Sequence, residues 1–245
     1  MKAIILAAGV GERLGDRAAG KPKCLLELGG MTLLRRHLEN MEDLPVTEVI
    51  VVTGYRREDI LHELDRIQTG LNVQTRFNPD FTQGSIVSLW KACGDLTSGG
   101  DIILMDADVL YDKAIIKKLT TTTLANCFLL DRNFEPGDEP VKLCVLEGTL
   151  VEFRKHVDKN LAFDFQGESV GFFRFSQGIA SRLATRVQDY IDRQRRHEPY
   201  EEAVRDLLLA DPEVFGYEDI TGLPWIEIDF PEDIERAETE ILTNI

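Results

Sequence analysis

The sequence has few basic residues for its size: 28 Lys and Arg stand against 43 Asp and Glu, so the formal net charge of the 245 residues is −15. This balance argues against general affinity for nucleic acids, because phosphate backbones are bound by basic surfaces. No apolar run approaches the roughly 20 residues that span a bilayer, so membrane insertion is not expected. The apolar run at the start is too short for a secretory signal.

Cysteine is also scarce, and its pattern excludes the usual cysteine chemistry. The four cysteines form no CxxC pair and have no histidine at ligand spacing: Cys24, Cys93, Cys127 and Cys144. We interpret them as reduced thiols, which together with the absence of a signal predicts a cytoplasmic protein. The histidines are interpreted as surface or incidental side chains: His37, His62, His156 and His197.

In the first half of the chain, apolar runs alternate with segments of helical periodicity. Four runs are predicted as strands, and most of them are too apolar for half-exposed ones: 2–8, 48–54, 72–78 and 101–107. Three segments carry apolar residues at i, i+3 and i+4 and are predicted as helices: 31–41, 57–67 and 85–96. This alternation predicts a mainly parallel sheet covered by helices on both faces.

The pattern changes after about residue 125 and becomes richer in strands. Strand-like segments lie at 126–131, 141–155 and 168–176, and Glu147-Gly148 in the second of them predicts a hairpin. Helices are expected at 179–196, 199–210 and 231–242, with a short strand at 224–229 before the last. Because no repeat, linker or boundary is found, we expect one α/β domain over residues 1–245.

The segment 6–28 gathers glycines and cations on one loop of this acidic chain: Arg13, Arg17, Lys21 and Lys23. Glycine lets backbone N–H groups approach an anion closely, so the loop suits a phosphate. It is not a Walker A loop, because Lys21 is followed by Pro22 instead of Ser or Thr. It also fails the dinucleotide fingerprint, because Leu14 stands where the third glycine belongs. A solvated loop with incidental cations is the alternative.

This loop resembles the LAAGxGxR…PK signature of the sugar-phosphate and alcohol-phosphate nucleotidyltransferases. The matching positions are Leu6, Ala7, Ala8, Gly9, Gly11, Arg13, Pro22 and Lys23. The resemblance implies a Rossmann-like, GT-A-like nucleotidyltransferase fold in which the first of these residues bind the nucleotide. It also implies that Arg13 and Lys23 are catalytic. Fixed cations there would stabilise the charge that builds on an attacked α-phosphate.

Two aspartates, Asp106 and Asp108, lie just past the strand predicted at 101–107. Residues two apart in an extended segment point the same way, and Mg²⁺ is commonly held by one or two carboxylates plus substrate phosphates. The resemblance implies that Asp108 binds the catalytic metal and that Asp106 assists it at the nucleotide. The alternative is that Asp108 or Asp112 only caps the helix that begins at Lys113.

A second acidic pair, Glu227 and Asp229, precedes the last predicted helix. The resemblance makes Asp229 the second metal ligand and places Glu227 at the acceptor, whereas an N-cap is the alternative for Asp229. Asp106, Asp108 and Asp229 crowded together without a cation would repel one another, so the interpretation requires Mg²⁺.

The whole chain resembles the phosphocholine and inositol-phosphate cytidylyltransferase branch of this family. Besides the opening loop, the resemblance rests on Gly54-Tyr55, on Asn78 before a Ser-Leu helix, on DAD and on IEID near the end. It implies CTP as the nucleotide, bordered by Gly54, Gly84, Ser85 and Ser88. Ser85 is equally well explained as the N-cap of its helix.

The acceptor stays open at this point. Lys142 stands where choline-type relatives have an aromatic residue, and it is predicted to contact the acceptor's phosphate, with Gly171 nearby. Glu168 could bind a hydroxyl or an ammonium, or be an ordinary strand-end acid. Four aromatic residues could form a partial cage for a cation but are more typical of a core: Phe81, Trp90, Phe172 and Phe173. The departure at Lys142 weakens the case for phosphocholine and leaves a polyol phosphate or a phosphonate such as aminoethylphosphonate open, so the acceptor is not resolved.

The sequence therefore predicts a Mg²⁺-dependent cytidylyltransferase that converts CTP and a phosphorylated alcohol to a CDP-alcohol and pyrophosphate. Residues 1–124 would bind the nucleotide and residues 125–245 the acceptor, in a chain that could form a homodimer. A sugar-1-phosphate nucleotidyltransferase with another NTP is one alternative. A DxD glycosyltransferase is a second alternative, but its reaction gives no reason for the glycines and cations of the opening loop. A nucleotide-binding protein without activity is a third, but it would not require the three aspartates.

Overall fold

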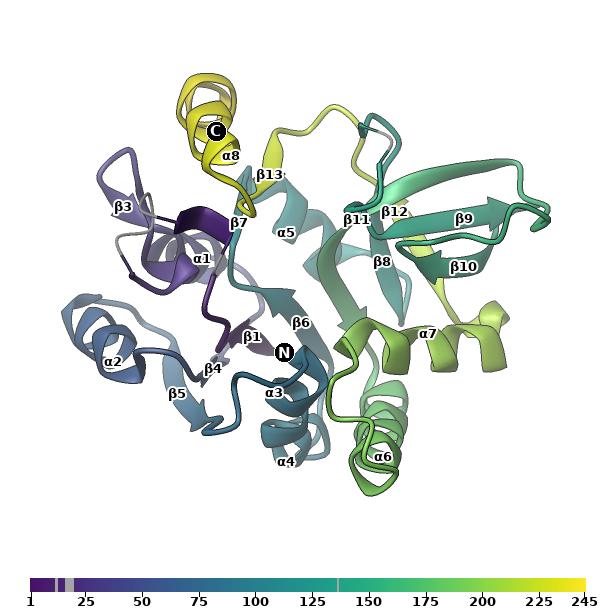
Figure 1. Ribbon diagram of the computed structural model, residues 1–245, viewed down its shortest axis with the longest axis horizontal. Coiled ribbons are helices and arrows are strands. Elements are labelled where there is room, and N and C mark those ends of the chain that lie inside the picture. Colours follow the sequence, from purple (N-terminus) through teal and green to yellow (C-terminus); the bar gives the residue numbers. More distant parts are fainter. Residues whose placement is uncertain (12, 16–19, 136) are drawn as a thin grey trace.

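A central mixed sheet organises the chain, whose computed structural model describes residues 1–11, 13–15, 20–135 and 137–245. Arg17, one of the cations noted in the opening loop, lies outside the described residues. The main path of the sheet runs β10-β9-β11-β6-β1-β4-β5 (Figure 1). Its strands are β1 (Lys2–Ala7), β4 (Glu48–Thr53), β5 (Asn72–Phe77), β6 (Ile102–Asp106), β9 (Lys142–Leu146), β10 (Thr149–Arg154) and β11 (Phe165–Phe175).

The first half of the sheet is parallel, as the sequence predicts. β1 pairs in parallel with β4 on one side and with β6 on the other, and β4 pairs in parallel with β5. The chain thus leaves β1 toward β4 and β5, and later returns to the opposite side of β1 as β6. In open α/β sheets a ligand binds at such a reversal, beyond the carboxyl ends of the strands. Here those ends are Ala7 and Asp106.

The second half is mostly antiparallel, with one parallel pair, β8 (Cys127–Asp131) and β12 (Gly216–Asp219). β11 runs antiparallel to β6, β9 and β8. Glu147 and Gly148 form the turn between β9 and β10 with φ values of 49° and 79°. Left-handed values at both turn residues match the twist of a two-residue hairpin, so the predicted hairpin is confirmed.

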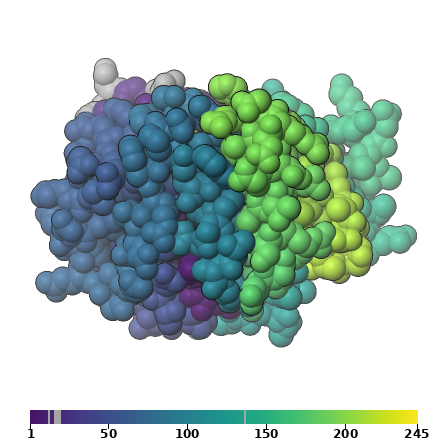
Figure 2. All heavy atoms as spheres, turned by 90° about the horizontal axis from the view of Figure 1, so that it is seen from below, coloured from purple at the N-terminus to yellow at the C-terminus, as the bar shows by residue number. Residues whose placement is uncertain are grey.

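Helices cover both faces of the sheet and enclose two hydrophobic cores. One core packs α3 (Ser85–Lys91), α6 (Gln177–Asp192) and α7 (Tyr200–Ala210) against one face. The other packs α1 (Leu33–Met41), α2 (Arg57–Arg66) and α5 (Lys113–Thr121) against the opposite face. Ile4 belongs to the first core and Ile5 to the second, as the alternation of side chains along a strand requires. Figure 2 shows the blue residues of the first half of the chain packed directly beside the green residues of the second half.

Several element boundaries differ from the sequence prediction. The segment predicted as one helix at 85–96 breaks at Ala92 into α3 and α4 (Cys93–Leu96). The last helix is α8 (Pro231–Arg236), followed by a π turn and a 3₁₀ turn. Strands of two or three residues were missed, namely β2 (Glu27–Leu28), β3 (Met31–Thr32) and β7 (Val109–Tyr111). Segments this short show no periodicity, and the same holds for the edge strand β12.

A third, smaller core joins the opening loop to the end of the chain. Leu14 is fully buried there, together with Leu28, Leu110 and Ile228. The residue that breaks the dinucleotide fingerprint is therefore a core residue. By packing on Ile228 and its neighbours, it holds the opening loop next to the segment that contains Asp229.

The four cysteines are unpaired in the described structure. Cys24, Cys127 and Cys144 are buried, and burial raises the pKa of each thiol. Among the described residues, no helix combines the length and the apolar composition needed to cross a membrane.

We predict that Gly84→Ala destabilises the fold, because a Cβ at this position would lie 2.2 Å from the carbonyl oxygen of Glu198. Relieving this clash requires a shift of the backbone, so the free energy of unfolding should fall by about 1–3 kcal/mol. Gly94→Ala is the matched control: its Cβ would meet nothing within 4 Å, inside α4. It should be neutral or stabilising by up to about 1 kcal/mol. Urea unfolding measures both, and equal stabilities would contradict the packing.

Candidate active site

The opening loop leaves β1 at Ala7 and returns through Pro22 to a 3₁₀ turn, Lys23–Leu25. Gly11 has φ 69°, and a Cβ at this position would lie 2.8 Å from Cγ of Lys23. The glycine is therefore needed twice, for its left-handed backbone and for the space that the lysine stem occupies.

Lys23 reaches from this loop to two aspartates. Its Nζ donates to Oδ2 of Asp108 at 2.9 Å and also to Oδ1 of Asp229. The three side chains are only 17%, 20% and 21% exposed. Burial disfavours the charged amine, but the two carboxylates outweigh it and hold the pKa of Lys23 above its ordinary value. A charged ammonium thus lies between the two predicted metal ligands.

Arg13 reaches the same place from the other side of the loop. Its Nη1 lies 3.4 Å from Oδ2 of Asp229 and 3.0 Å from Oε2 of Glu139, and its guanidinium lies over the ring of Phe230. Both cations that the sequence singled out as catalytic therefore meet a carboxylate from the far end of the chain.

A pair of short strands brings the aspartates together. β7 pairs antiparallel with β13 (Trp225–Glu227), so that Val109 lies opposite Glu227. The amide of Ile228 extends this pairing by donating to the carbonyl of Asp108 at 2.9 Å. Asp108 and Asp229 flank the two strands and consequently face the same space.

Neither aspartate caps a helix, which was the alternative for both. The cap of α5 is Asp112, which accepts from the amide of Ala114 at 2.6 Å. The residue before α8 is Phe230, and the amides of Asp229 and Phe230 donate to Asp233. The carboxylates of Asp108 and Asp229 are thus directed to the cations of the opening loop.

Glu227 completes a three-carboxylate group with Asp108 and Asp229. One oxygen of each lies within 4.8 Å of one oxygen of the others. Oxygen ligands at this separation suit Mg²⁺. Burial, followed by the charges of Asp108 and Asp229, holds the pKa of Glu227 well above its ordinary value. The three carboxylates therefore fit a magnesium ion, and Glu227 lies with the two predicted ligands, while its predicted contact with the acceptor stays a prediction.

Asp106 lies apart from this group, at the end of β6. Its Oδ2 accepts from the hydroxyl of Tyr200 at 2.8 Å, and burial together with the charge of Glu201 raises its pKa. Gly171 has φ 76°, and a Cβ there would lie 2.3 Å from the same oxygen. Gly171 thus makes room for Asp106. The sequence analysis predicted a helix over residues 199–210 but did not place Tyr200 and Glu201 at this site.

The interpretation of the histidines as surface or incidental side chains was wrong for His37. It is completely buried, with Nε2 3.2 Å from the carbonyl oxygen of Ala107 and Nδ1 3.3 Å from the hydroxyl of Tyr111. Burial lowers its pKa to about 4, so the ring is neutral. Through its contact with the carbonyl oxygen of Ala107, the His37 ring supports the turn between Asp106 and Asp108.

The other predicted nucleotide residues fall into two groups. Gly54 packs against the opening loop, because a Cβ there would lie 2.6 Å from the carbonyl oxygen of Ala8. Gly84, which caps α3, instead contacts the segment before α7. Ser85 is the first residue of α3 and not its N-cap, and it accepts from the amide of Tyr200 at 2.9 Å. Ser88 accepts from Asn78 at 3.0 Å. A nucleotide contact of these last three residues stays a prediction.

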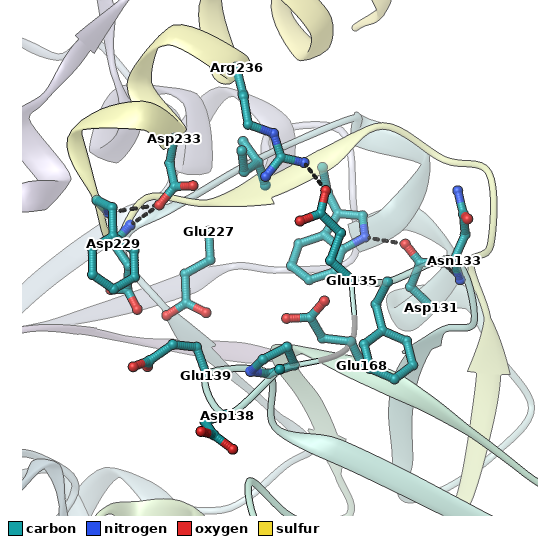
Figure 3. Close-up of a pocket in the computed structure, with 16 residues that line it drawn as sticks. Asp131, Asn133, Glu135, Asp138, Glu139, Glu168, Glu227, Asp229, Asp233 and Arg236 are labelled. Carbon is teal, nitrogen blue, oxygen red and sulfur yellow. Dashed lines mark hydrogen bonds and ion pairs between the residues drawn. The ribbon is translucent and has the colours of Figure 1, made fainter.

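A cavity of about 520 Å³ opens beside Glu227 and Asp229. Figure 3 shows the carboxylates of Glu227, on β13, and Glu168, on β11, pointing into it. Among the described lining residues, Arg236 is the one basic side chain, and it pairs with Glu135 at 3.7 Å. The lining carboxylates are Asp131, Glu135, Asp138, Glu139, Glu168, Glu227, Asp229 and Asp233.

Most of these acids already have partners, but among the described residues neither Glu168 nor Glu227 has a hydrogen bond or an ion pair. Asp131 accepts from Nε1 of Trp225 at 2.7 Å, and Glu139 pairs with Arg13 and Lys155. Burial and the charge of Asp131 raise the pKa of Glu168 to about 7. At neutral pH this carboxyl is poised to ionise when a cation approaches.

Lys142 supports the cavity wall without lining the cavity. Its Nζ donates to the carbonyls of Gly137, Pro140 and Lys155 at 2.7, 3.2 and 2.7 Å. An ammonium has three donors, so a contact with the acceptor would require one of these bonds to be exchanged.

The four aromatic residues considered for a cage belong to or flank the cores. Phe172 and Phe173 are completely buried, and Phe81 and Trp90 pack against the first core. None of them lines the cavity beside Glu227.

Comparison with known proteins identifies the family. Residues 3–147, more than half of the chain, match the MobA-like NTP transferase domain. The chain is 26% identical over 97% of its length to CMP-5′-(3-aminopropyl)phosphonate synthase of Streptomyces rubellomurinus, but spans only 38% of that protein. It is 24% identical to choline-phosphate cytidylyltransferase of Streptococcus pneumoniae, covering 100% of this chain and 99% of that one.

The fold agrees with this relationship. The inositol-1-phosphate CTP transferase of T. maritima superimposes with a TM-score of 0.77 over 98% of this chain and 97% of the other, at 15% sequence identity. The mostly parallel mixed sheet with its β-rich second half is therefore the nucleotidyltransferase fold that the sequence predicts. On the family match and the loop-to-aspartate geometry together, this chain belongs to the MobA-like NTP transferases.

Proposed function

We propose that the chain is a Mg²⁺-dependent cytidylyltransferase that transfers CMP from CTP to a phosphorylated alcohol or a phosphonate. The observation that carries this proposal is the convergence of Lys23 and Arg13 on Asp108 and Asp229, at the carboxyl ends of β1 and β6. A family that transfers nucleotides needs cations and metal-binding acids at one α-phosphorus, and this is the place where the described chain assembles both.

In the proposed reaction an oxygen of the acceptor's phosphate or phosphonate forms a bond to the α-phosphorus of CTP. The bond from that phosphorus to the bridging oxygen breaks, and pyrophosphate leaves with the electron pair. Lys23 and Arg13 stabilise the added charge on the α-phosphate oxygens and on the leaving group. The acceptor oxygen is already anionic at neutral pH, so no side chain has to remove a proton.

A magnesium ion fits the carboxylates of Asp108 and Asp229, with Glu227 beside them. When bound, it supplies positive charge to the phosphate oxygens of the nucleotide. The choice of CTP rests on the relatives, since the names of the aminopropylphosphonate synthase and the choline-phosphate enzyme both describe cytidylyl products or activity.

We further propose that the preferred acceptor carries a cationic group, an ammonium or a quaternary ammonium, at the end away from its phosphate. An acceptor with phosphate alone would be repelled by a cavity lined so largely with carboxylates. Glu168 offers an unmatched, partly buried carboxyl to a cation. Two relatives are named for acceptors of this kind, aminopropylphosphonate and phosphocholine.

A pyrophosphate-release assay that crosses four NTPs with several acceptors tests the proposal. The acceptors should include phosphocholine, aminoethylphosphonate, glycerol phosphate, inositol phosphate and a hexose 1-phosphate. We expect release with CTP and the two acceptors that carry a cationic nitrogen, phosphocholine and aminoethylphosphonate. Release only with a hexose 1-phosphate and another NTP would favour a sugar-phosphate nucleotidyltransferase. Sugar transfer without pyrophosphate would indicate a glycosyltransferase.

Lys23→Ala and Asp108→Ala should each lower turnover by about 10² or more, because each removes a preorganised charge at the reacting phosphorus. The controls are Lys117→Ala and Asp65→Ala, which change the same residue types at exposed positions on α5 and α2. They should keep the parental rate. Near-parental turnover in either site variant, with the fold intact by circular dichroism, would remove that residue from the mechanism.

Glu168→Gln should raise KM for phosphocholine about tenfold and leave KM for glycerol phosphate unchanged, because only the former loses an ion pair. In the parent, the preference for phosphocholine over glycerol phosphate should grow as pH rises from about 6 to about 8, since Glu168 ionises near pH 7. The preference of the variant should not change with pH. Glu213→Gln, exposed and outside the cavity, is the control. Equal pH profiles in parent and Glu168→Gln would contradict the assignment.

A further inference from the structure

We propose that Lys23 serves as the resident cation of the free enzyme: its ammonium takes the place between Asp108 and Asp229 that a divalent ion needs, and leaves it when a triphosphate binds. Divalent ion and nucleotide then bind as coupled partners. This inference rests on the proposed function for the identity of the metal ligands and of the nucleotide site.

The oxygens of the two aspartates are largely engaged. Oδ1 of Asp229 accepts from Lys23 and Oδ2 lies 3.4 Å from Arg13, while Oδ2 of Asp108 accepts from Lys23 at 2.9 Å. A divalent ion bound to these carboxylates would lie close to the ammonium, and the two cations would repel each other in a largely buried place. The ion and the contact seen here are therefore alternatives.

The ion pairs of Lys23 also offset the negative charge of the acidic group. Asp108, Glu227 and Asp229 lie within reach of one ion, so their charges need a cation in every state of the enzyme. Lys23 supplies it in the free state. A bound ion supplies it in the loaded state, and the lysine becomes available to phosphate oxygens.

The chain allows Lys23 to change partners without moving its backbone. The residue begins a 3₁₀ turn after Pro22, and Leu26 at the end of that turn donates back to the carbonyl of Lys23 at 3.0 Å. Its four-carbon stem is flexible. The stem crosses Gly11, in the same glycine loop that is predicted to hold the triphosphate, so an alternative anion would lie within reach.

The consequence follows from linkage. If the triphosphate removes a cation that competes with the divalent ion, nucleotide increases affinity for the ion, and the ion increases affinity for nucleotide by the same factor. The free enzyme should then bind divalent ions weakly, although it has three carboxylates in place.

Mn²⁺ titration followed by electron paramagnetic resonance, without nucleotide, tests this directly. Lys23→Met removes the charge and keeps most of the stem, whereas Lys23→Arg keeps the charge. We expect Lys23→Met to bind Mn²⁺ about tenfold more tightly than the parent or more, and Lys23→Arg to bind as weakly as the parent. Adding Asp108→Asn to Lys23→Met should abolish the gain, which locates the ion. If Lys23→Met does not fold, Lys23→Gln provides the same comparison.

A parent that binds Mn²⁺ as tightly as Lys23→Met would overturn the inference, and so would a gain in Lys23→Met that survives Asp108→Asn. Failure of the proposed function has a different signature, namely no pyrophosphate from any NTP and acceptor pair with the parental enzyme. The two results come from separate assays and are distinguishable.

Discussion

The contact of Lys23 with Asp108 and Asp229 is the interaction on which this account depends. It joins three segments, from near the start, the middle and the end of the chain, within one largely buried space. Charges taken out of water are costly unless they are paired, so the fold must hold all three side chains in register for the cluster to be stable. A charge cluster of this kind at a ligand-binding edge is more typical of a functional site than of a stabilising one.

The architecture explains why the three segments meet. The reversal of strand order at β1 opens the carboxyl ends of β1 and β6 to a ligand, and these ends lead into the glycine loop and the aspartate turn. The small core around Leu14 and Ile228 then holds the end of the chain against that edge. Pairing of β7 with β13 sets the spacing of the carboxylates. Residues from the second half of the chain thus complete a site that the first half begins.

The sequence predicted the elements whose patterns are long and local. The strands and amphipathic helices of the first half were placed to within a few residues, although β5 is only partly buried. The resemblance to nucleotidyltransferases, which began from the LAAGxGxR…PK pattern, is confirmed by the family match. The features that the sequence could not predict depend on contacts between residues that are distant in the chain. Strands as short as β7 have no period, the buried state of His37 depends on Ala107 and Tyr111, and the cavity around Glu168 exists only after folding. The sequence also does not show that the side chains of Ser85 and Lys142 already form hydrogen bonds with other groups of the protein.

The central claim is that cations of the opening loop and carboxylates from two later segments act on one phosphorus. A crystal structure of the protein with CTP and Mg²⁺ tests it most directly. The account predicts an α-phosphate within hydrogen-bonding distance of Lys23 and Arg13, and one ion shared by Asp108 and Asp229. A triphosphate bound elsewhere on the sheet, or an ion that touches neither aspartate, would contradict it.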